Sequence, residues 1–181
     1  MIIYLIGMMG SGKTTIGKHL ADRLQFKWVD LDQLIEKESG LSTHEYIQKF
    51  GIDKFRDRET EALESHTEPG SVISCGGGVV INPNHRHWMR NHGVVIYLQC
   101  DIDTLVKRLE TTNLAMRPLL MGDDLKTRLT ALYDSRKALY EEASHYTISC
   151  DEKTIDEIVE EIVILISHLQ KNEIMLDQKI K

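Results

Sequence analysis

The strongest chemical signal in the sequence lies at residues 7–14, whose spacing fits the G-x-x-x-x-G-K-[ST] pattern of phosphate-binding loops. Its glycines permit a tight loop in which successive backbone N–H groups converge on phosphate oxygens. Lys13 can reach the β- and γ-phosphates of a nucleotide, and the Thr14 hydroxyl can ligate Mg²⁺. A strand predicted at Ile2–Ile6 and a helix predicted at 14–24 supply the flanking elements that this motif needs. The predicted nucleotide contacts are Gly10, Ser11, Gly12, Lys13, Thr14 and Thr15.

Two carboxylates, Asp30 and Asp32, follow the short apolar segment Trp28–Val29, which predicts a second strand. If the strand continues, its period of two places both carboxylates on the same face. One could then hold a Mg²⁺-bound water, and the other could accept a hydrogen bond from a hydroxyl nucleophile and orient it. The alternative is that Asp32 caps a helix expected at 34–38.

Three consecutive glycines at 76–78 follow another apolar segment, Val72–Cys75. Glycines directly after a strand let the backbone approach a ligand closely, although a bare tight turn is the alternative. Arg56 and Arg136 lie in segments that predict helices. Each could bind an anion, and each could equally be a solvated surface charge.

Three neighbouring histidines raise the question of a metal site: His85, His87 and His92. His85 and His87 are two residues apart, so they do not share a helical face. We therefore predict that these histidines are surface residues rather than metal ligands.

The elements that must position these residues alternate along the chain. Strands are predicted at 2–6, 28–29, 72–75, 94–98 and 146–149, and helices at 14–24, 34–38, 43–50, 53–65, 84–91, 102–109, 125–143 and 155–169. This alternation predicts an α/β fold of three α/β/α layers around a central parallel sheet of about five strands. Ligands then bind at the carboxyl ends of the strands, where the phosphate loop, the two carboxylates and the three glycines all fall.

The chain is long enough for one domain, which we expect to span 1–181 with a core at 1–168. The irregular stretch at about 110–124 contains Arg117, and it is predicted to be a lid because long loops in compact domains are usually functional or disordered. Residues 169–181 are expected to form a tail that frays.

Composition excludes several classes of protein. The formal net charge is −6, which argues against a general nucleic-acid or anionic-membrane surface. The three cysteines (Cys75, Cys100 and Cys150) lie far apart, so zinc-ribbon and thioredoxin motifs are ruled out, and we expect buried thiols in a reducing cytoplasm. We see no secretory leader and no apolar run of transmembrane length, so a cytoplasmic protein is expected.

Phosphate binding alone leaves two classes open, a metabolite kinase and a nucleotide-dependent switch or binding module. The chain has no N-K-x-D guanine motif, which a GTPase should carry. Its short length and single lid-like stretch favour a small kinase.

Six motifs occur together: G-M-M-G-S-G-K-T at 7–14, D-L-D at 30–32, F-R-x-x-E at 55–59, G-G-G at 76–78, R-P-L-L at 117–120 and R-x-x-L-Y at 136–140. In order and spacing they resemble the shikimate kinase family over residues 2–165. The resemblance implies a P-loop NTPase fold like that of the nucleoside-monophosphate kinases, with a mobile lid. It also implies transfer of the ATP γ-phosphoryl group to the 3-hydroxyl of shikimate, giving shikimate 3-phosphate and ADP in aromatic amino-acid biosynthesis.

The resemblance also implies roles for single residues. Asp32 would bind the shikimate hydroxyls and orient, or deprotonate, the nucleophile. Arg56 and Arg136 would bind the shikimate carboxylate, and Gly77 and Gly78 would line the ring.

On the nucleotide side, Lys13 and Arg117 would act with Asp32 as the catalytic residues, and Arg117 would reach the ATP phosphates from the lid. Thr14, with Asp30 through a water, would hold Mg²⁺. Arg108 and Lys153 would lie by the adenine. ATP and shikimate are the expected partners of a monomer. Another small-metabolite kinase of this architecture, such as a gluconate kinase, is the alternative.

Two positions depart from the family pattern. Ile52 follows Gly51 where family members usually have Glu, and Cys75 precedes the three glycines where Thr or Ser often stands. Neither departure removes a residue that the resemblance assigns to a ligand.

Overall fold

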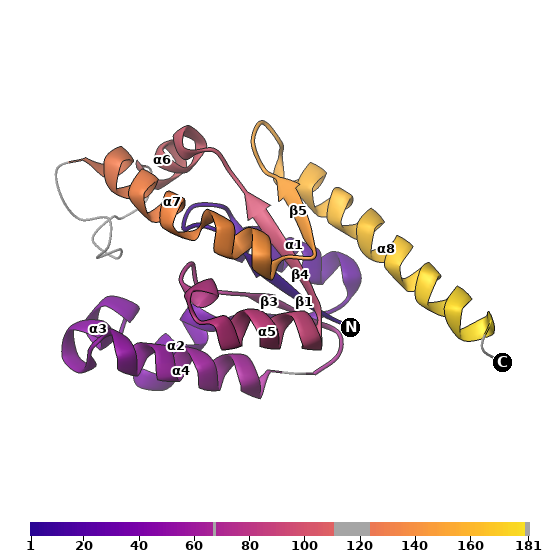
Figure 1. The fold of residues 1–181 in the computed structure, drawn as a ribbon, viewed down its shortest axis with the longest axis horizontal. Coiled ribbons are helices and arrows are strands. Elements are labelled where there is room, and N and C mark those ends of the chain that lie inside the picture. The colour runs from indigo at the N-terminus through magenta and orange to yellow at the C-terminus, as the bar shows by residue number, and fades with distance from the viewer. Residues whose placement is uncertain (67, 111–123, 180–181) are drawn as a thin grey trace.

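The computed structural model describes residues 1–66, 68–110 and 124–179. Within these residues five strands form one sheet in the order β2-β3-β1-β4-β5, and every neighbouring pair is parallel (Figure 1). The strands are β1 (Ile2–Ile6), β2 (Lys27–Asp30), β3 (Ser71–Ser74), β4 (Val94–Gln99) and β5 (Tyr146–Ser149). The prediction of a parallel sheet of about five strands is confirmed.

The central strand β1 is buried along its whole length, and β3 beside it is buried as well. A strand that helices cover on both faces has no polar side, which explains why Ile2–Ile6 is a continuous apolar run instead of an alternating one. The edge strands β2 and β5 are only partly buried, and their sequences are correspondingly more polar.

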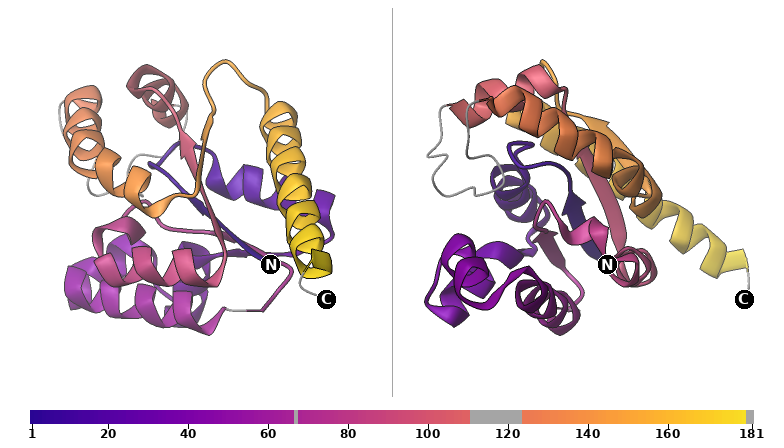
Figure 2. Two further views of the ribbon diagram at one scale, coloured as in Figure 1. Left: turned by 45° about the vertical axis from the view of Figure 1, so that its right-hand side comes forward. Right: turned by 60° about the vertical axis from the view of Figure 1, so that its left-hand side comes forward.

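Helices cover both faces of the sheet (Figure 2). α1 packs with α8 on one face, α5 packs with α7 on the other, and α2, α3 and α4 pack together near the β2 edge. The helices are α1 (Lys13–Leu24), α2 (Leu31–Ser39), α3 (Thr43–Phe50), α4 (Ile52–Ser65), the 3₁₀ turn η1 (Val79–Ile81), α5 (Pro83–His92), α6 (Ile102–Glu110), α7 (Leu125–Ala143) and α8 (Ile155–Lys179).

The expected end of α8 at residue 169 is wrong, because the helix continues to Lys179. Residues 170–179 contain neither glycine nor proline, so no residue there stops a helix. Most of the tail expected to fray is therefore helical.

Residues 111–123, which hold Arg117 and nearly all of the predicted lid, lie outside the described residues. Glu110 ends α6, and the Asp124 side chain caps α7 by accepting from the backbone N–H groups of Lys126 and Thr127. All three cysteines are buried and free, as predicted. No helix in the described part of the chain is both long and apolar enough to cross a membrane.

Candidate active site

The phosphate loop lies between the end of β1 and the first turn of α1. Gly12 precedes the helix with φ 94°, a left-handed conformation that favours glycine. The Lys13 ammonium donates to the carbonyl oxygens of Gly7 and Met8, at 2.9 Å each. The charge of Lys13 is therefore held inside the loop, where a nucleotide's phosphates would bind. Thr15, in the same helical turn, is exposed.

Thr14 and Asp30 lie together at the mouth of this loop. The Thr14 hydroxyl donates to Asp30 Oδ2 at 2.7 Å, and Asp30 Oδ1 accepts from the backbone N–H of Gln33 at 3.2 Å. A hydroxyl oxygen beside a carboxylate oxygen is a donor set suited to a hard divalent cation. The structure thus brings together the two residues predicted to hold Mg²⁺.

Asp32 is placed differently from both readings of the sequence. β2 stops at Asp30 and α2 begins at Leu31, so the two carboxylates do not share a strand face. Asp30, not Asp32, caps α2, because the Asp30 side chain accepts from the backbone N–H of Gln33. Asp32 lies in the first turn of the helix.

In that position the Asp32 carboxylate lies against Gly76, the first of the three glycines. A β-carbon added at Gly76 would lie 2.7 Å from Asp32 Oδ1, so only glycine allows this approach. Burial, reinforced by the nearby charge of Asp30, raises the pKa of Asp32 to about 6, while Lys13 opposes the shift. A carboxylate with that pKa can exchange a proton near neutral pH.

The two predicted arginines also contact the glycine loop, residues 76–78. A β-carbon at Gly78 would collide with the Arg56 guanidinium, and Arg136 donates to the Gly77 carbonyl at 3.1 Å. Arg136 is only 6% exposed, which is incompatible with a solvated surface charge. The structure therefore brings both arginines and Asp32 to one glycine loop, and the surface alternative is wrong for Arg136.

Glu59 belongs to this cluster, and sequence reasoning gave it no role. Its Oε2 accepts from Arg56 at 2.6 Å, and Oε1 has no hydrogen-bond partner in the described part of the structure. The side chain is 1% exposed, and burial raises its pKa to about 7 despite the pull of Arg56. The sequence did carry one signal for this contact: Glu59 comes three residues after Arg56, and residues three apart share a helical face.

The two residues predicted near the adenine make different contacts in the structure. Arg108 lies against the phosphate loop, 3.5 Å from the carbonyl oxygens of Gly10 and Ser11, and it donates to the Cys150 carbonyl at 3.0 Å. Lys153 follows β5 and forms an ion pair with Glu161 of α8 at 2.5 Å. The structure thus places Arg108 beside the loop and pairs Lys153 with α8.

His85 is buried, so its prediction as a surface residue is wrong. Its ring nitrogens lie 2.7 Å from Thr60 Oγ1 and 3.2 Å from the Val79 carbonyl oxygen. Two hydrogen bonds offset the cost of burying an imidazole, and no local pattern announces such tertiary partners. His87 and His92 are exposed, as predicted. The described residues hold no cluster of three or more potential metal ligands of the His, Cys, Asp and Glu types.

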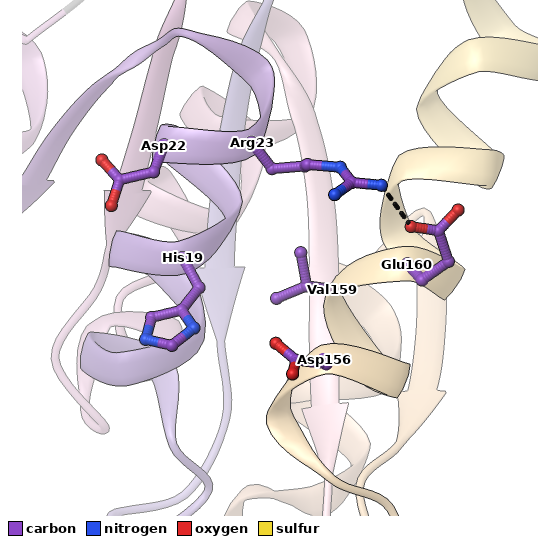
Figure 3. Close-up of a pocket in the computed structure, with 6 residues that line it drawn as sticks. All are labelled: His19, Asp22, Arg23, Asp156, Val159 and Glu160. Atoms are coloured by element: carbon purple, nitrogen blue, oxygen red, sulfur yellow. Dashed lines mark hydrogen bonds and ion pairs between the residues drawn. The ribbon is translucent and has the colours of Figure 1, made fainter.

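A pocket lies apart from this cluster, between α1 and α8 (Figure 3). The ion pair between Arg23 and Glu160, at 3.0 Å, spans it. It contains none of the predicted site residues. Its lining is His19, Asp22, Arg23, Asp156, Val159 and Glu160.

Comparisons with known proteins relate the chain to one family. The family model described as shikimate kinase matches residues 9–167. "Shikimate kinase 2" of Salmonella heidelberg strain SL476 is 40% identical over 162 residues, which cover 89% of each chain. The solved shikimate kinase of Acinetobacter baumannii in complex with shikimate superposes with a TM-score of 0.87 at 33% identity, covering 92% of this chain and 93% of that one.

A gluconokinase from Sinorhizobium meliloti 1021 has a TM-score of 0.62 at 14% identity, covering 96% of this chain and 95% of that one. At that identity the likeness shows a shared fold alone. The family model matches most of the chain, and the curated relative is 40% identical over 89% of it. The chain therefore belongs to the shikimate kinase family.

Proposed function

We propose that this protein transfers the γ-phosphoryl group of ATP to the 3-hydroxyl of shikimate, releasing shikimate 3-phosphate and ADP. The observation that carries the proposal is the position of the glycine loop. A β-carbon at Gly77 would lie 3.5 Å from the Met9 backbone nitrogen of the phosphate loop. The cluster of Asp32, Arg56 and Arg136 is therefore next to the site expected for the γ-phosphate.

The cluster has the chemistry of a polyhydroxylated carboxylate. An arginine presents a planar fork of N–H donors that matches a carboxylate better than a lysine does. Asp32 supplies an acceptor for hydroxyl groups. Two arginines and one carboxylate thus fit one acid group and one hydroxylated ring face.

In the reaction, the acceptor hydroxyl attacks the γ-phosphorus in line with the leaving ADP. The new O–P bond forms as the bond from the γ-phosphorus to the β,γ-bridging oxygen breaks, and the hydroxyl proton goes to Asp32. Lys13 stabilises the charge on the phosphoryl oxygens. Phosphoryl transfer depends mainly on such positioning and charge stabilisation.

Thr14 and Asp30 are the residues that would hold Mg²⁺, Asp30 through a bound water. A bound Mg²⁺ would neutralise charge on the β- and γ-phosphates. We expect Asp30→Asn to raise the Mg²⁺ concentration for half-maximal activity about 10-fold or more, because one charge leaves the site. Asparagine caps helices as well as aspartate does, so the melting temperature should change little. An unchanged Mg²⁺ titration would remove Asp30 from the metal site.

We expect Arg136→Lys to raise the shikimate KM at least about 10-fold while the ATP KM changes less than about 2-fold. Lysine keeps the charge but loses the fork, and a hydrogen bond to a charged group is worth roughly 1.5–3 kcal/mol. Arg58→Lys is the matched control, since Arg58 pairs with Glu38 and Glu61 at the surface. A shift in the ATP KM alone would move Arg136 to the nucleotide side.

Several further assignments stay predictions: the lid with Arg117, the adenine contacts of Arg108 and Lys153, the monomeric state and the cytoplasmic location. Regiochemistry tests the proposed reaction itself. Phosphorus–proton correlation by NMR on the product should place the phosphate on the 3-oxygen of shikimate. A phosphate on another oxygen, or no organic phosphate, would contradict the proposal.

A further inference from the structure

Tyr140 places its hydroxyl where the glycine loop meets the phosphate loop. The side chain is fully buried in α7, and its ring stacks on that of Tyr97 with centroids 5.0 Å apart. Its Oη donates to the Gly77 carbonyl at 2.5 Å and lies 3.6 Å from Met8 Sδ. One hydroxyl therefore contacts both loops.

The same carbonyl also accepts from Arg136 at 3.1 Å. Arg136 and Tyr140 are four residues apart and so share one face of α7. Gly77 thus receives two donors from a single helix, one of which is a proposed ligand of the substrate carboxylate. Burial raises the pKa of Tyr140 to about 12, which keeps the phenol protonated and able to donate.

We infer that Tyr140 is a positioning residue: its hydroxyl fixes the Gly77 carbonyl and, through it, holds Arg136 and the glycine loop in place against the phosphate loop. The inference rests on the proposed function. Tyr140 itself does not need to touch the substrate. Its loss would let the acceptor site shift relative to the phosphate loop, and small displacements of a bound nucleophile cost rate as well as affinity.

The test is Tyr140→Phe compared with Tyr97→Phe. Both substitutions remove one buried hydroxyl from the same stacked pair, but within the described structure no hydrogen bond joins the Tyr97 hydroxyl to the glycine loop or the phosphate loop. We expect Tyr140→Phe to raise the shikimate KM about 10-fold and to lower kcat, because one buried hydrogen bond is lost. The ATP KM should stay within about 2-fold of the wild type. Tyr97→Phe should leave all three constants within about 2-fold of the wild type.

Two further measurements separate positioning from mere structural support. Incorporating 4-aminophenylalanine at position 140 restores an N–H donor and should return the shikimate KM to within about 3-fold of the wild type. In the Arg136→Lys background, Tyr140→Phe should change the shikimate KM less than it does in the wild type, because the two residues share one acceptor.

The inference would be overturned by wild-type kinetics in Tyr140→Phe, by equal losses in Tyr140→Phe and Tyr97→Phe, or by failure of the amino variant to rescue. Failure of Tyr140→Phe alone to fold would also overturn it, since the hydroxyl would then serve the fold. A wild-type enzyme that does not phosphorylate shikimate would instead refute the proposed function, so the two failures are distinguishable.

Discussion

Replacing Lys13 with alanine is expected to lower kcat by about 10³-fold or more while the fold stays intact. The Lys13 ammonium lies inside the phosphate loop on the carbonyls of Gly7 and Met8, so its charge is already positioned for the β- and γ-phosphates. Removing a charge that stabilises the transition state costs several kcal/mol, and each 1.36 kcal/mol is a factor of about ten in rate.

Lys18→Ala is the matched control for this experiment. Lys18 lies on the same helix, is exposed and places its ammonium 4.5 Å from the Trp28 ring centroid. It should keep nearly full activity, and circular dichroism should show both variants folded. A Lys13→Ala enzyme with a tenth of wild-type turnover would refute the assignment of the phosphate loop.

Asp32→Asn should retain ATP binding and lose about 10²–10⁴-fold in kcat, the usual contribution of a general base. Asparagine keeps the shape but cannot take the hydroxyl proton. The control is Asp22→Asn, an exposed carboxylate on α1. Near-normal turnover of Asp32→Asn, measured with saturating ATP and shikimate, would show that the carboxylate only shapes the site.

The raised pKa of Asp32 adds a pH dependence. Protonation removes the acceptor, so wild-type kcat/KM should fall as the pH drops through about 6, and Asp32→Asn should lack this limb. Protonating Glu59, whose pKa is about 7, weakens its ion pair with Arg56. This should spread the fall in kcat/KM over a wider pH range. A wild-type profile that stays flat from pH 8 to pH 5 would contradict the environment described for both carboxyls.

Ionisation of Asp32 should affect the stability of the fold in the direction opposite to its effect on activity. Because the folded-state pKa of Asp32 is raised, the folded protein binds the proton more tightly than the unfolded chain does, so the ionised group destabilises the fold above that pKa. Asp32→Asn should therefore melt higher than the wild type at pH 8. The difference should shrink as the pH falls from about 6 toward 4, the unfolded value.

Elements with strong local signals were predicted well. α3 and α7 have the predicted bounds because their sequences carry the stop and start signals: Ser42 and Glu45 form a capping box at α3, and Asp124 caps α7. The phosphate loop was equally clear, because its glycines, lysine and threonine act through neighbouring residues in one chain segment.

Some features that depend on contacts with other elements, or on the exact start of a helix, were not predicted. The helix α2 was predicted to start near residue 34 with Asp32 as the alternative cap, but Asp30 caps it and it begins three residues earlier, at Leu31. Burial of His85 depends on Thr60 and Val79, which belong to other elements. Arg136 could be read as a surface charge until the structure placed it against the carbonyl of Gly77.

The most direct test of the central claim is an assay of ADP release with three acceptor conditions: shikimate, gluconate and no acceptor. The cluster of Asp32, Arg56 and Arg136 predicts rapid ADP release with shikimate and only background release in the other two conditions. Release that is faster with gluconate would reassign the acceptor, and release that does not depend on an acceptor would show an ATPase instead of a metabolite kinase. No release in any condition would contradict catalysis altogether.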